Sequence, residues 1–462
     1  MGVSFADHPM FKEGGFGQPP ARFEADIYDC EVEGQIPSDI HGVFYRMQCD
    51  FEYPPPKNEW ATGFNGDGHI SGFFFKDGRV SYRGRYIMTD RLKAERAARR
   101  RLFGVYRNRY TDDPSVAKLN RSAANTHLYW HGGKLLVLKE DSLPWEVDPI
   151  TFESKGPWDF YGKYKGVSMS AHPKIDPVTG DMICYGYQAK GDLTNDIVIY
   201  TVGRDGHIKH EVWFKMPYVG MVHDISITQK HVVVPVVGNV TSDARLRSGE
   251  PMWQWDVTKP TMTAIVPRGG ETKDVRWFKG PNRSTLHFLN AVTEGNKVVM
   301  ELPVSETQRA PSQIRRWTFD LNSKDDTMGE DPMVIGTGLL PRMDDRYLSL
   351  PYKYGYVGTR DAETKRNVYQ KFDIHKGVVG TYTAPANITG LQECSFVPRK
   401  GGKAEGDGYV VGVATNSDTM ESEVHIIDAN KMEQGTVAVI KMPFRLRSGT
   451  HTNWYSGTDI KI

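Results

Sequence analysis

Short apolar or alternating runs, separated by turn-forming residues, fill most of this chain. The runs GVFYRMQ (42–48), HVVVPVV (231–237) and KVVMELPV (297–304) are rich in valine and aromatic residues. The segments KDG, HGG, PVTGD, GRDG and EGN stand between such runs. Turns of this composition join antiparallel strands in hairpins. The pattern therefore predicts a chain that is mainly β.

Helical periodicity is confined to residues 90–102 and 114–124. Elsewhere short strands follow one another at regular spacing through the 462 residues, with no low-complexity linker. This spacing favours a β-propeller over a string of sandwiches, although no WD or kelch repeat is present. We expect a single all-β propeller domain over residues 1–462, with a small helical insertion at about 90–125.

Composition narrows the range of partners. Lys+Arg number 58 and Asp+Glu 57, and this balance argues against a protein that binds nucleic acid through its charge. The basic segment 93–109 (KAERAARRRLFGVYRNR) is expected to be a solvated helix face rather than an anion site. No run approaches the ~20 apolar residues of a membrane span, and the N-terminus lacks a secretory pattern.

The cysteines indicate a reducing compartment. Cys30, Cys49, Cys184 and Cys394 lie far apart and form no CxxC pair. Four cysteines in a chain of this length are typical of buried thiols rather than of a disulfide framework. We therefore expect a cytoplasmic protein.

Four of the 14 histidines stand out from the rest. Each is at the start or end of a strand-like run, beside small residues; they are His172 (SMSAHPKID), His223 (GMVHDISIT), His287 (STLHFLNA) and His451 (SGTHTNWY). Any one of them alone is more typical of a buried structural histidine. In a closed radial fold, however, residues far apart in sequence converge on one axis. The four together predict a metal site, and imidazole ligands suit iron, copper or zinc.

Two glutamates interrupt otherwise apolar segments. Glu140 stands in LLVLKEDSLP and Glu393 in LQECSFVPR. A carboxylate in an apolar strand is costly unless it is hydrogen-bonded, and metal-bound imidazoles typically donate their other N–H to a carboxylate. Glu140 and Glu393 are either such acceptors or edge residues that face water.

At this point the sequence resembles the carotenoid cleavage oxygenase family over nearly its whole length. The resemblance is carried by FNGDGHISGFFFKDGRVSYRGRYIMTDR, NTHLYWHGGKLLVLKEDSLPWEVDPITFES, SAHPKIDPVTGD, ECSFVPR and the four histidine segments. It implies a seven-bladed propeller with a helical cap, and Fe(II) on the propeller axis. By position, the ligands would be His172, His223, His287 and His451, with Glu140 and Glu393 hydrogen-bonded behind two of them.

The sequence departs from the family pattern at one position, where a glutamate is usual. The family usually has a third glutamate just before a Pro-Arg pair, where this chain reads TGLLPRMDDRY with Leu339 and Leu340. The corresponding hydrogen bond to a histidine is expected to be absent, or to come from another residue such as Asp344 or Asp345.

Within the family the chain is most similar to the lignostilbene dioxygenases. Tyr106 and Lys139 match the pair that binds a phenolic hydroxyl in those enzymes, and Phe64 matches an aromatic residue that lies against the stilbene. Strand alternation would put Lys139 and Glu140 on opposite faces, one toward substrate and one behind the metal. Lys139 and Tyr106 would then stabilise the phenolate, Lys139 as a charge and Tyr106 as a donor.

The resemblance thus implies an Fe(II) dioxygenase that splits the central double bond of a 4-hydroxystilbene with O2 into two aldehydes. The alternatives are a carotenoid or apocarotenoid cleavage enzyme and a non-catalytic propeller scaffold. A zinc hydrolase fits poorly, because the chain has no HExxH or GxSxG motif. The expected partner is a small phenolic stilbene, and whether the protein is a homodimer stays open.

Overall fold

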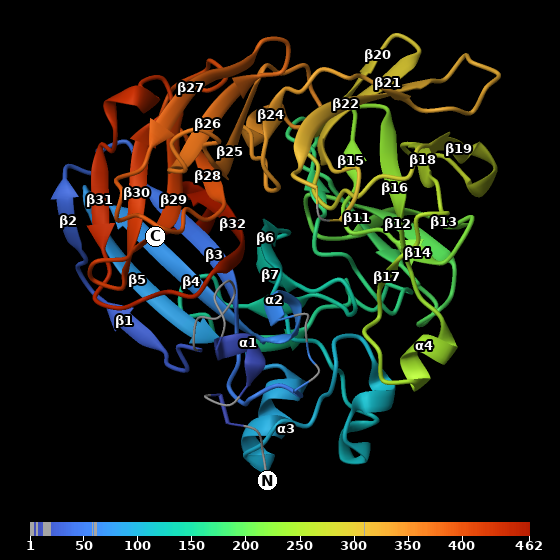
Figure 1. Cartoon of the computed structure of the whole chain (residues 1–462), viewed down its shortest axis with the longest axis horizontal. Helices are drawn as coiled ribbons and strands as arrows, with labels where there is room; N and C mark the ends of the chain where they lie inside the picture. The colour runs from blue at the N-terminus through green and yellow to red at the C-terminus, as the bar shows by residue number, and fades with distance from the viewer. Residues whose placement is uncertain (1–3, 6–7, 13–19, 58, 60–61, 309) are drawn as a thin grey trace.

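The computed structural model describes the chain except for residues 1–3, 6–7, 13–19, 58, 60–61 and 309. In the described part the strands form seven sheets, which surround one axis as the blades of a β-propeller (Figure 1). The seven-bladed all-β fold expected from the sequence is confirmed. The division of the chain into a single domain stays a prediction.

Neighbouring strands within each sheet are hydrogen-bonded to one another. In order of pairing, the first sheet is β1 (Ala25–Ile27), β5 (Arg79–Tyr86), β4 (Asp67–Lys76), β3 (Gly42–Asp50) and β32 (Gly449–Ser456). The second is β6 (His127–His131), β7 (Lys134–Leu138), β8 (Trp145–Val147) and β9 (Ser154–Pro157). The third is β10 (Lys174–Ile175), β11 (Met182–Tyr187), β12 (Asp196–Val202) and β13 (Ile208–Lys215).

The fourth sheet is β14 (Gly220–Met221), β16 (His231–Val240), β18 (Thr261–Pro267) and β19 (Arg276–Gly280), with β15 (Ser226–Ile227) and β17 (Gln254–Trp255) on β16. The fifth is β20 (Asn290–Glu294), β21 (Lys297–Val304), β22 (Gln313–Asp320) and β23 (Gly329–Glu330), with β24 (Gly336–Thr337) on β22. The sixth is β25 (Tyr354–Arg360), β26 (Asn367–Asp373) and β27 (Gly377–Thr383). The seventh is β2 (Glu31–Gly34), β31 (Ala438–Lys441), β30 (Glu421–Asp428), β29 (Gly408–Asn416) and β28 (Cys394–Pro398).

Two sheets combine strands from both ends of the chain. In the first sheet β3 pairs with β32, with Phe44 opposite Trp454. In the seventh β2 pairs with β31, with Val32 opposite Ile440. The ring of blades is therefore closed by hydrogen bonds between the N-terminal and C-terminal segments.

The hydrophobic core lies between neighbouring blades. Tyr45 of β3 and Leu135 of β7 belong to one cluster, which joins the first and second sheets. Tyr369 of β26 and Val410 of β29 belong to another, which joins the sixth and seventh sheets. Because both faces of an inner strand are covered, β3 is buried along its whole length, which explains runs that are apolar without alternation.

Helices are short and few among the described residues. They are α1 (Pro9–Lys12), α2 (Thr62–Asn65), α3 (Asp90–Ala98), α4 (Asp243–Arg247) and α5 (Gly457–Ile460), with 3-10 turns at Arg109–Thr111, Pro114–Val116, Thr272–Asp274, Asp345–Tyr347 and Met432–Gln434. In Figure 1, α3 lies near the lower edge of the view and α2 near its centre. No helix among these is long and apolar enough to cross a membrane.

The expected helical insertion is smaller than the sequence pattern suggested. The helix α3 begins after the N-cap Thr89 and ends at Ala98, before the C-cap Arg99, which has a left-handed φ of 52°. Between residues 114 and 124 only the single 3-10 turn forms. The basic segment 93–109 is solvated only in part, because Lys93, Arg99, Arg100 and Arg109 are exposed whereas Arg107 is buried. Arg91 lies 3.4 Å from Asp67, and Arg107 lies 3.6 Å from Glu140.

Candidate metal centre and substrate site

The four singled-out histidines meet at one point. His172 precedes β10, His223 follows β14, His287 precedes β20, and His451 lies within β32. Each of these strands is at the edge of its own sheet. One nitrogen from each ring belongs to a group whose atoms all lie within 4.8 Å of one another. Four blades therefore each contribute one imidazole to a single cluster.

The spacing of the imidazole nitrogens fits a metal ion. The Nε2 atom of His223 is 3.1 Å from that of His172 and 3.2 Å from that of His287. Metal–nitrogen bonds of about 2.0–2.1 Å put neighbouring ligand nitrogens about 2.9–3.4 Å apart, from right-angled to tetrahedral geometry. Lone pairs that converge in this way repel one another unless a cation lies between them.

Burial and the neighbouring rings keep His172 and His287 neutral and ready to bind a cation. Burial lowers the pKa of His172 well below its usual value, and the neighbouring imidazoles His223 and His451 lower it further. Burial, followed by His451 and His223, has the same effect on the pKa of His287. Neutral imidazole is the form that binds metals.

Glu140 hydrogen-bonds behind one of the histidines. Its Oε2 accepts a hydrogen bond from Nδ1 of His223 at 3.0 Å, and its Oε1 accepts one from the hydroxyl of Tyr106 at 2.6 Å. Burial alone would raise the pKa of Glu140. The bond and charge of His223, then Arg107 and Tyr106, instead lower it to about 2. The carboxylate is therefore ionised and can orient the imidazole.

Glu393 has the same arrangement behind a second histidine. Its Oε1 is 3.1 Å from Nδ1 of His451, and its Oε2 accepts from the backbone N–H of Thr452 at 2.6 Å. Arg342 lies 3.6 Å from this carboxylate. Burial opposes ionisation, but His451 and Arg342 together lower the pKa of Glu393. Each of the two glutamates is thus paired with an arginine, buried in the case of Arg107 and partly buried in the case of Arg342.

His287 has no such carboxylate. Its Nδ1 is buried and has no hydrogen-bond partner among the described residues. Leu339 is 43% exposed. Asp344 accepts from Arg346 instead, and Asp345 lies 3.9 Å from Arg342 with its side chain 71% exposed. Neither aspartate replaces the missing glutamate.

Lys139, Tyr106 and Phe64 lie together beside the cluster. Nζ of Lys139 is 4.7 Å from the centre of the Tyr106 ring, and that ring is 6.0 Å from the ring of Phe64. Lys139 and Tyr106 are buried, whereas Phe64 is 42% exposed. Burial lowers the pKa of Lys139. Because Tyr106 also contacts Glu140, these residues and the histidines form one continuous site.

The strand positions expected for Lys139, Glu140 and Glu393 are wrong, although Lys139 and Glu140 do contact different parts of the site. β7 ends at Leu138, so Lys139 and Glu140 are beyond the strand and their directions do not follow from strand alternation. Glu393 likewise directly precedes β28 rather than lying within it. Both glutamates are in loops, where the chain can turn a carboxylate toward the axis.

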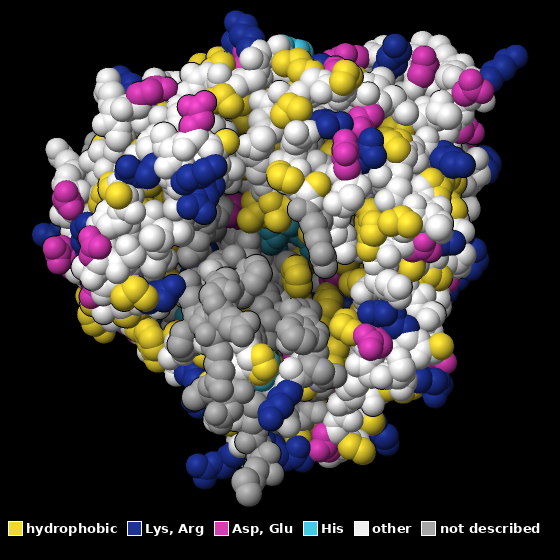
Figure 2. Space-filling model, in the orientation of Figure 1, with side chains coloured by type: hydrophobic (Ala, Val, Ile, Leu, Met, Phe, Trp, Pro, Cys, Tyr) yellow, Lys and Arg dark blue, Asp and Glu magenta, His cyan; other side chains and the backbone are white. Residues whose placement is uncertain are grey.

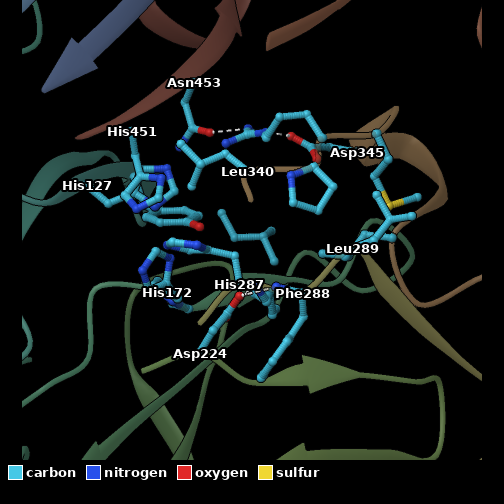
Figure 3. Close-up of a pocket in the computed structure, with 18 of the residues that line it drawn as sticks. His127, His172, Asp224, His287, Phe288, Leu289, Leu340, Asp345, His451 and Asn453 are labelled. Atoms are coloured by element: carbon cyan, nitrogen blue, oxygen red, sulfur yellow. Dashed lines mark hydrogen bonds and ion pairs between the residues drawn. The ribbon is translucent and has the colours of Figure 1, made fainter. Parts of the chain in front are cut away.

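A cavity borders the histidine cluster. Its volume is about 340 Å³, and it is lined by His172, His287 and His451, and by a further histidine, His127 (Figure 3). Asp345 lies across the view from these histidines, with Leu340 between them (Figure 3). On the face seen in Figure 2 the surface is hollowed near its centre, where histidine side chains lie below hydrophobic ones.

Sequence reasoning missed several residues of the site. The ring of His127 lies 4.6 Å from that of His451, centre to centre, and neither of its ring nitrogens has a partner in the described structure. Arg107 and Arg342 hold the two glutamates, and Asn125 accepts a hydrogen bond from Lys139. Nothing in the local pattern distinguishes these residues, because their partners are far away in sequence.

Comparisons with known proteins agree with this geometry. Residues 18–456 match the family described as Retinal pigment epithelial membrane protein. The chain is 38% identical to lignostilbene-alpha,beta-dioxygenase isozyme III of Sphingomonas paucimobilis, over 96% of each chain. It is 36% identical to isoeugenol monooxygenase of Pseudomonas putida, over 95% of this chain and 96% of that one.

A solved structure extends the likeness to three dimensions. The lignostilbene dioxygenase of Pseudomonas brassicacearum has a TM-score of 0.92 and 37% identity, over 98% of this chain and 100% of that one. The match therefore includes all seven blades, which surround the histidine cluster. On the family match and these identities, this chain belongs to the Retinal pigment epithelial membrane protein family, that of the carotenoid cleavage oxygenases.

Proposed function

We propose that this protein is an Fe(II) dioxygenase that cleaves the central double bond of a 4-hydroxystilbene with O2, giving two aromatic aldehydes. The observation that carries the proposal is the contact between Tyr106 and Glu140. It joins a buried lysine and tyrosine, suited to a phenol, to a four-imidazole cluster, suited to a metal that activates dioxygen. The relatives named for lignostilbene and isoeugenol support the same chemistry.

The iron would be held by His172, His223, His287 and His451. Four neutral ligands leave positions of an octahedron open, and the two hydrogen-bonded carboxylates, Glu140 and Glu393, balance the charge of the ion. When bound, ferrous iron supplies the site at which dioxygen is activated for attack on the alkene. Copper and zinc also suit imidazole ligands, so metal analysis is part of the test.

We assign to Lys139 the binding and deprotonation of the phenolic hydroxyl of the substrate. Two of its N–H bonds point to the carbonyl oxygen of Phe64 and to Oδ1 of Asn125. A neutral amine so placed has its lone pair left for the proton of the substrate. The phenol O–H bond would break as a third N–H bond forms on Lys139. The resulting phenolate, next to an ammonium group, pushes electron density through the ring toward the double bond.

Tyr106 has a different role from the one expected. A hydroxyl has a single proton, and Tyr106 donates it to Glu140. Toward a neutral phenol, whose own single proton is directed to Lys139, Tyr106 therefore has no proton to offer. It can donate to a phenolate only by leaving Glu140. The ring of Phe64, partly exposed, would lie against the aromatic ring of the substrate and set its angle.

One other substrate class has support of its own. Isoeugenol, named for one relative, is also a para-hydroxylated ring with a conjugated double bond, but it has a propenyl group in place of the second ring. Lys139 and Tyr106 would recognise the hydroxyl of either compound equally. The preference for a stilbene or for isoeugenol therefore depends on the part of the site that lies beyond the cleaved double bond, away from the phenol.

The test is cleavage of a panel of compounds by purified, iron-loaded protein under ¹⁸O2. The panel contains a 4-hydroxystilbene, its 4-methoxy analogue, isoeugenol and an apocarotenoid. The expected result is two labelled aldehydes from the 4-hydroxystilbene and little product from the methoxy compound. Cleavage of the apocarotenoid alone would favour the carotenoid alternative. Protein that purifies without stoichiometric metal and binds none would favour the scaffold.

The cellular compartment and the oligomeric state of the enzyme stay predictions. All four cysteines lie in the described part of the chain and are buried, as expected for thiols in a reducing, cytoplasmic compartment. A homodimer, the other open expectation, is tested by the molar mass in solution.

A further inference from the structure

The side chain of Asn125 lies fully buried beside Lys139, two residues before β6. Its Nδ2 donates to the backbone carbonyls of Phe64 at 3.1 Å and Gly66 at 2.7 Å. Its Oδ1 accepts from Nζ of Lys139 at 3.0 Å. Carbonyl oxygens only accept hydrogen bonds, so the amide nitrogen must face them and the amide oxygen must face the lysine. The backbone thus fixes the direction of this amide.

The acceptors of Lys139 are both uncharged. They are the carbonyl oxygen of Phe64 and the amide oxygen of Asn125. In the described structure Lys139 forms no ion pair with a carboxylate within 4.0 Å. The other groups that act on its charge are, in order, Asp141, Cys49, Glu140 and Arg91, with the ring of Tyr106 at 4.7 Å. A buried amine in such surroundings releases its proton more easily than an exposed one.

We propose that Asn125 is a positioning residue for Lys139, which aims the amine at the phenol of the substrate and, being uncharged, leaves it without a counter-ion. The inference rests on the proposed function. An aspartate would have nearly the same shape but would hold Lys139 as an ammonium ion, which has no lone pair to take up the proton of the phenol. Proton uptake by Lys139 therefore requires an uncharged amide at this position, and not only a side chain of the same shape.

The same amide also positions Phe64. Asn125 and Lys139 both donate to the carbonyl of Phe64, at the end of the short helix α2. The residue that would take the phenol proton and the ring that would lie against the substrate are consequently held by one hydrogen-bond network. Loss of Asn125 should disturb both of them together, whereas loss of Phe64's ring alone should leave Lys139 in place.

The sharpest test is Asn125→Asp, followed by the pH dependence of kcat/KM for a 4-hydroxystilbene. The acidic limb of this profile reports protonation of Lys139 in the free enzyme. A carboxylate next to an amine favours the ammonium form, by about 1–3 pH units at this distance. The limb should therefore move to higher pH by about 1–3 units, and kcat/KM on the acid side should fall about 10-fold or more for each unit.

Asn290→Asp is the matched control. Asn290 is equally buried, and its Nδ2 also donates to two backbone carbonyls, those of Tyr347 and Leu350. It contacts no residue of the proposed phenol site. In the Asn290→Asp variant, the acidic limb of the kcat/KM profile should lie at the same pH as in the unmodified protein. A folded, iron-loaded Asn125→Asp protein whose limb does not move, or moves no further than that of Asn290→Asp, overturns the inference.

A second measurement avoids both turnover and a destabilising charge. The ultraviolet absorbance of a bound 4-hydroxystilbene shifts when its phenol ionises, and it can be titrated without O2. In Asn125→Ala the phenol should bind at least about 10-fold more weakly and ionise at higher pH, whereas the 4-methoxy analogue, whose binding depends on Phe64 but not on Lys139, should be weakened less. Unaltered binding and ionisation would overturn the inference. Unmodified protein that binds and ionises the phenol but does not cleave it would overturn the proposed function alone.

Discussion

Tyr106 and Glu140 are joined by a hydrogen bond of 2.6 Å that connects the phenol-binding side of the site to its metal side. Glu140 uses its other oxygen to hold Nδ1 of His223. The hydroxyl of Tyr106 and the imidazole of His223 therefore compete for the charge of one carboxylate. A change in the hydrogen bond at one end must alter the strength of the bond at the other.

Tyr106→Phe should retain iron and lose turnover. Without the tyrosine, Glu140 has one donor fewer and holds His223 more strongly, so the metal stays bound. The phenolate loses the tyrosine proton that would stabilise it once Tyr106 leaves Glu140, and kcat/KM for a 4-hydroxystilbene should fall by about 10- to 100-fold, in the range found when such supporting bonds are removed. Iron content and turnover, measured on the same preparation, check this outcome.

Tyr352→Phe provides the control for that substitution. Tyr352 also donates from a buried position to a buried glutamate, Glu301, at 2.7 Å, but away from the histidines. Both variants lose one buried Tyr–Glu bond. If Tyr352→Phe reduces turnover as much as Tyr106→Phe does, the effect is one of stability, and the coupling of phenol and metal through Glu140 is wrong.

Lys139→Met should remove most activity on phenols without removing iron. Proton transfer by a positioned side chain contributes about 10²- to 10⁴-fold to rate, so a loss of at least about 100-fold is expected. The 4-methoxy stilbene, which has no proton to give, should be a poor substrate for the unmodified protein and should lose nothing further in the variant. Rates for the two substrates in the two proteins form the test.

Lys371→Met is a matched control for Lys139→Met. Lys371 is also buried, and its Nζ also donates to a backbone carbonyl, that of Ala429, and to the amide oxygen of Asn430. Its removal should cost stability but leave turnover per iron unchanged. Equal losses in the two variants would mean that burial of a lysine, and not its contact with the phenol, explains the effect.

The sequence predicted the parts of the fold and site that depend on local context. The turn residues and apolar runs predicted the strands, and the contexts of His172 and His451 singled out residues that the structure brings together. The pairing of Arg107 with Glu140 and of Asn125 with Lys139 could not be predicted, since these contacts connect separate loops. The strand placement of Lys139 was wrong, because β7 ends one residue earlier.

Replacement of any ligand histidine should release iron. His287→Ala is informative, because Nδ1 of His287 is buried without a hydrogen-bond partner among the described residues. The variant should purify with little iron, and a chelator should no longer lower its melting temperature. Metal that binds only the native state stabilises it, so the unmodified protein should melt lower after chelation. His425→Ala, at a buried histidine outside the cluster, should behave as the unmodified protein does.

Glu140→Gln and Glu393→Gln should both weaken iron binding, but only the first should also alter the response to the phenol. Each substitution replaces an ionised acceptor with a neutral amide, and losses of about 10- to 100-fold in metal affinity or activity are typical. Glu140 alone contacts Tyr106, so Glu140→Gln should further raise the KM for a 4-hydroxystilbene at saturating iron. Glu393→Gln should leave that KM unchanged. The control is Glu423→Gln, which breaks a buried glutamate–histidine contact of 2.8 Å, to His425, in the seventh sheet. Full iron occupancy and unchanged turnover in both test variants, or losses matched by Glu423→Gln, would contradict the assigned roles of the two carboxylates.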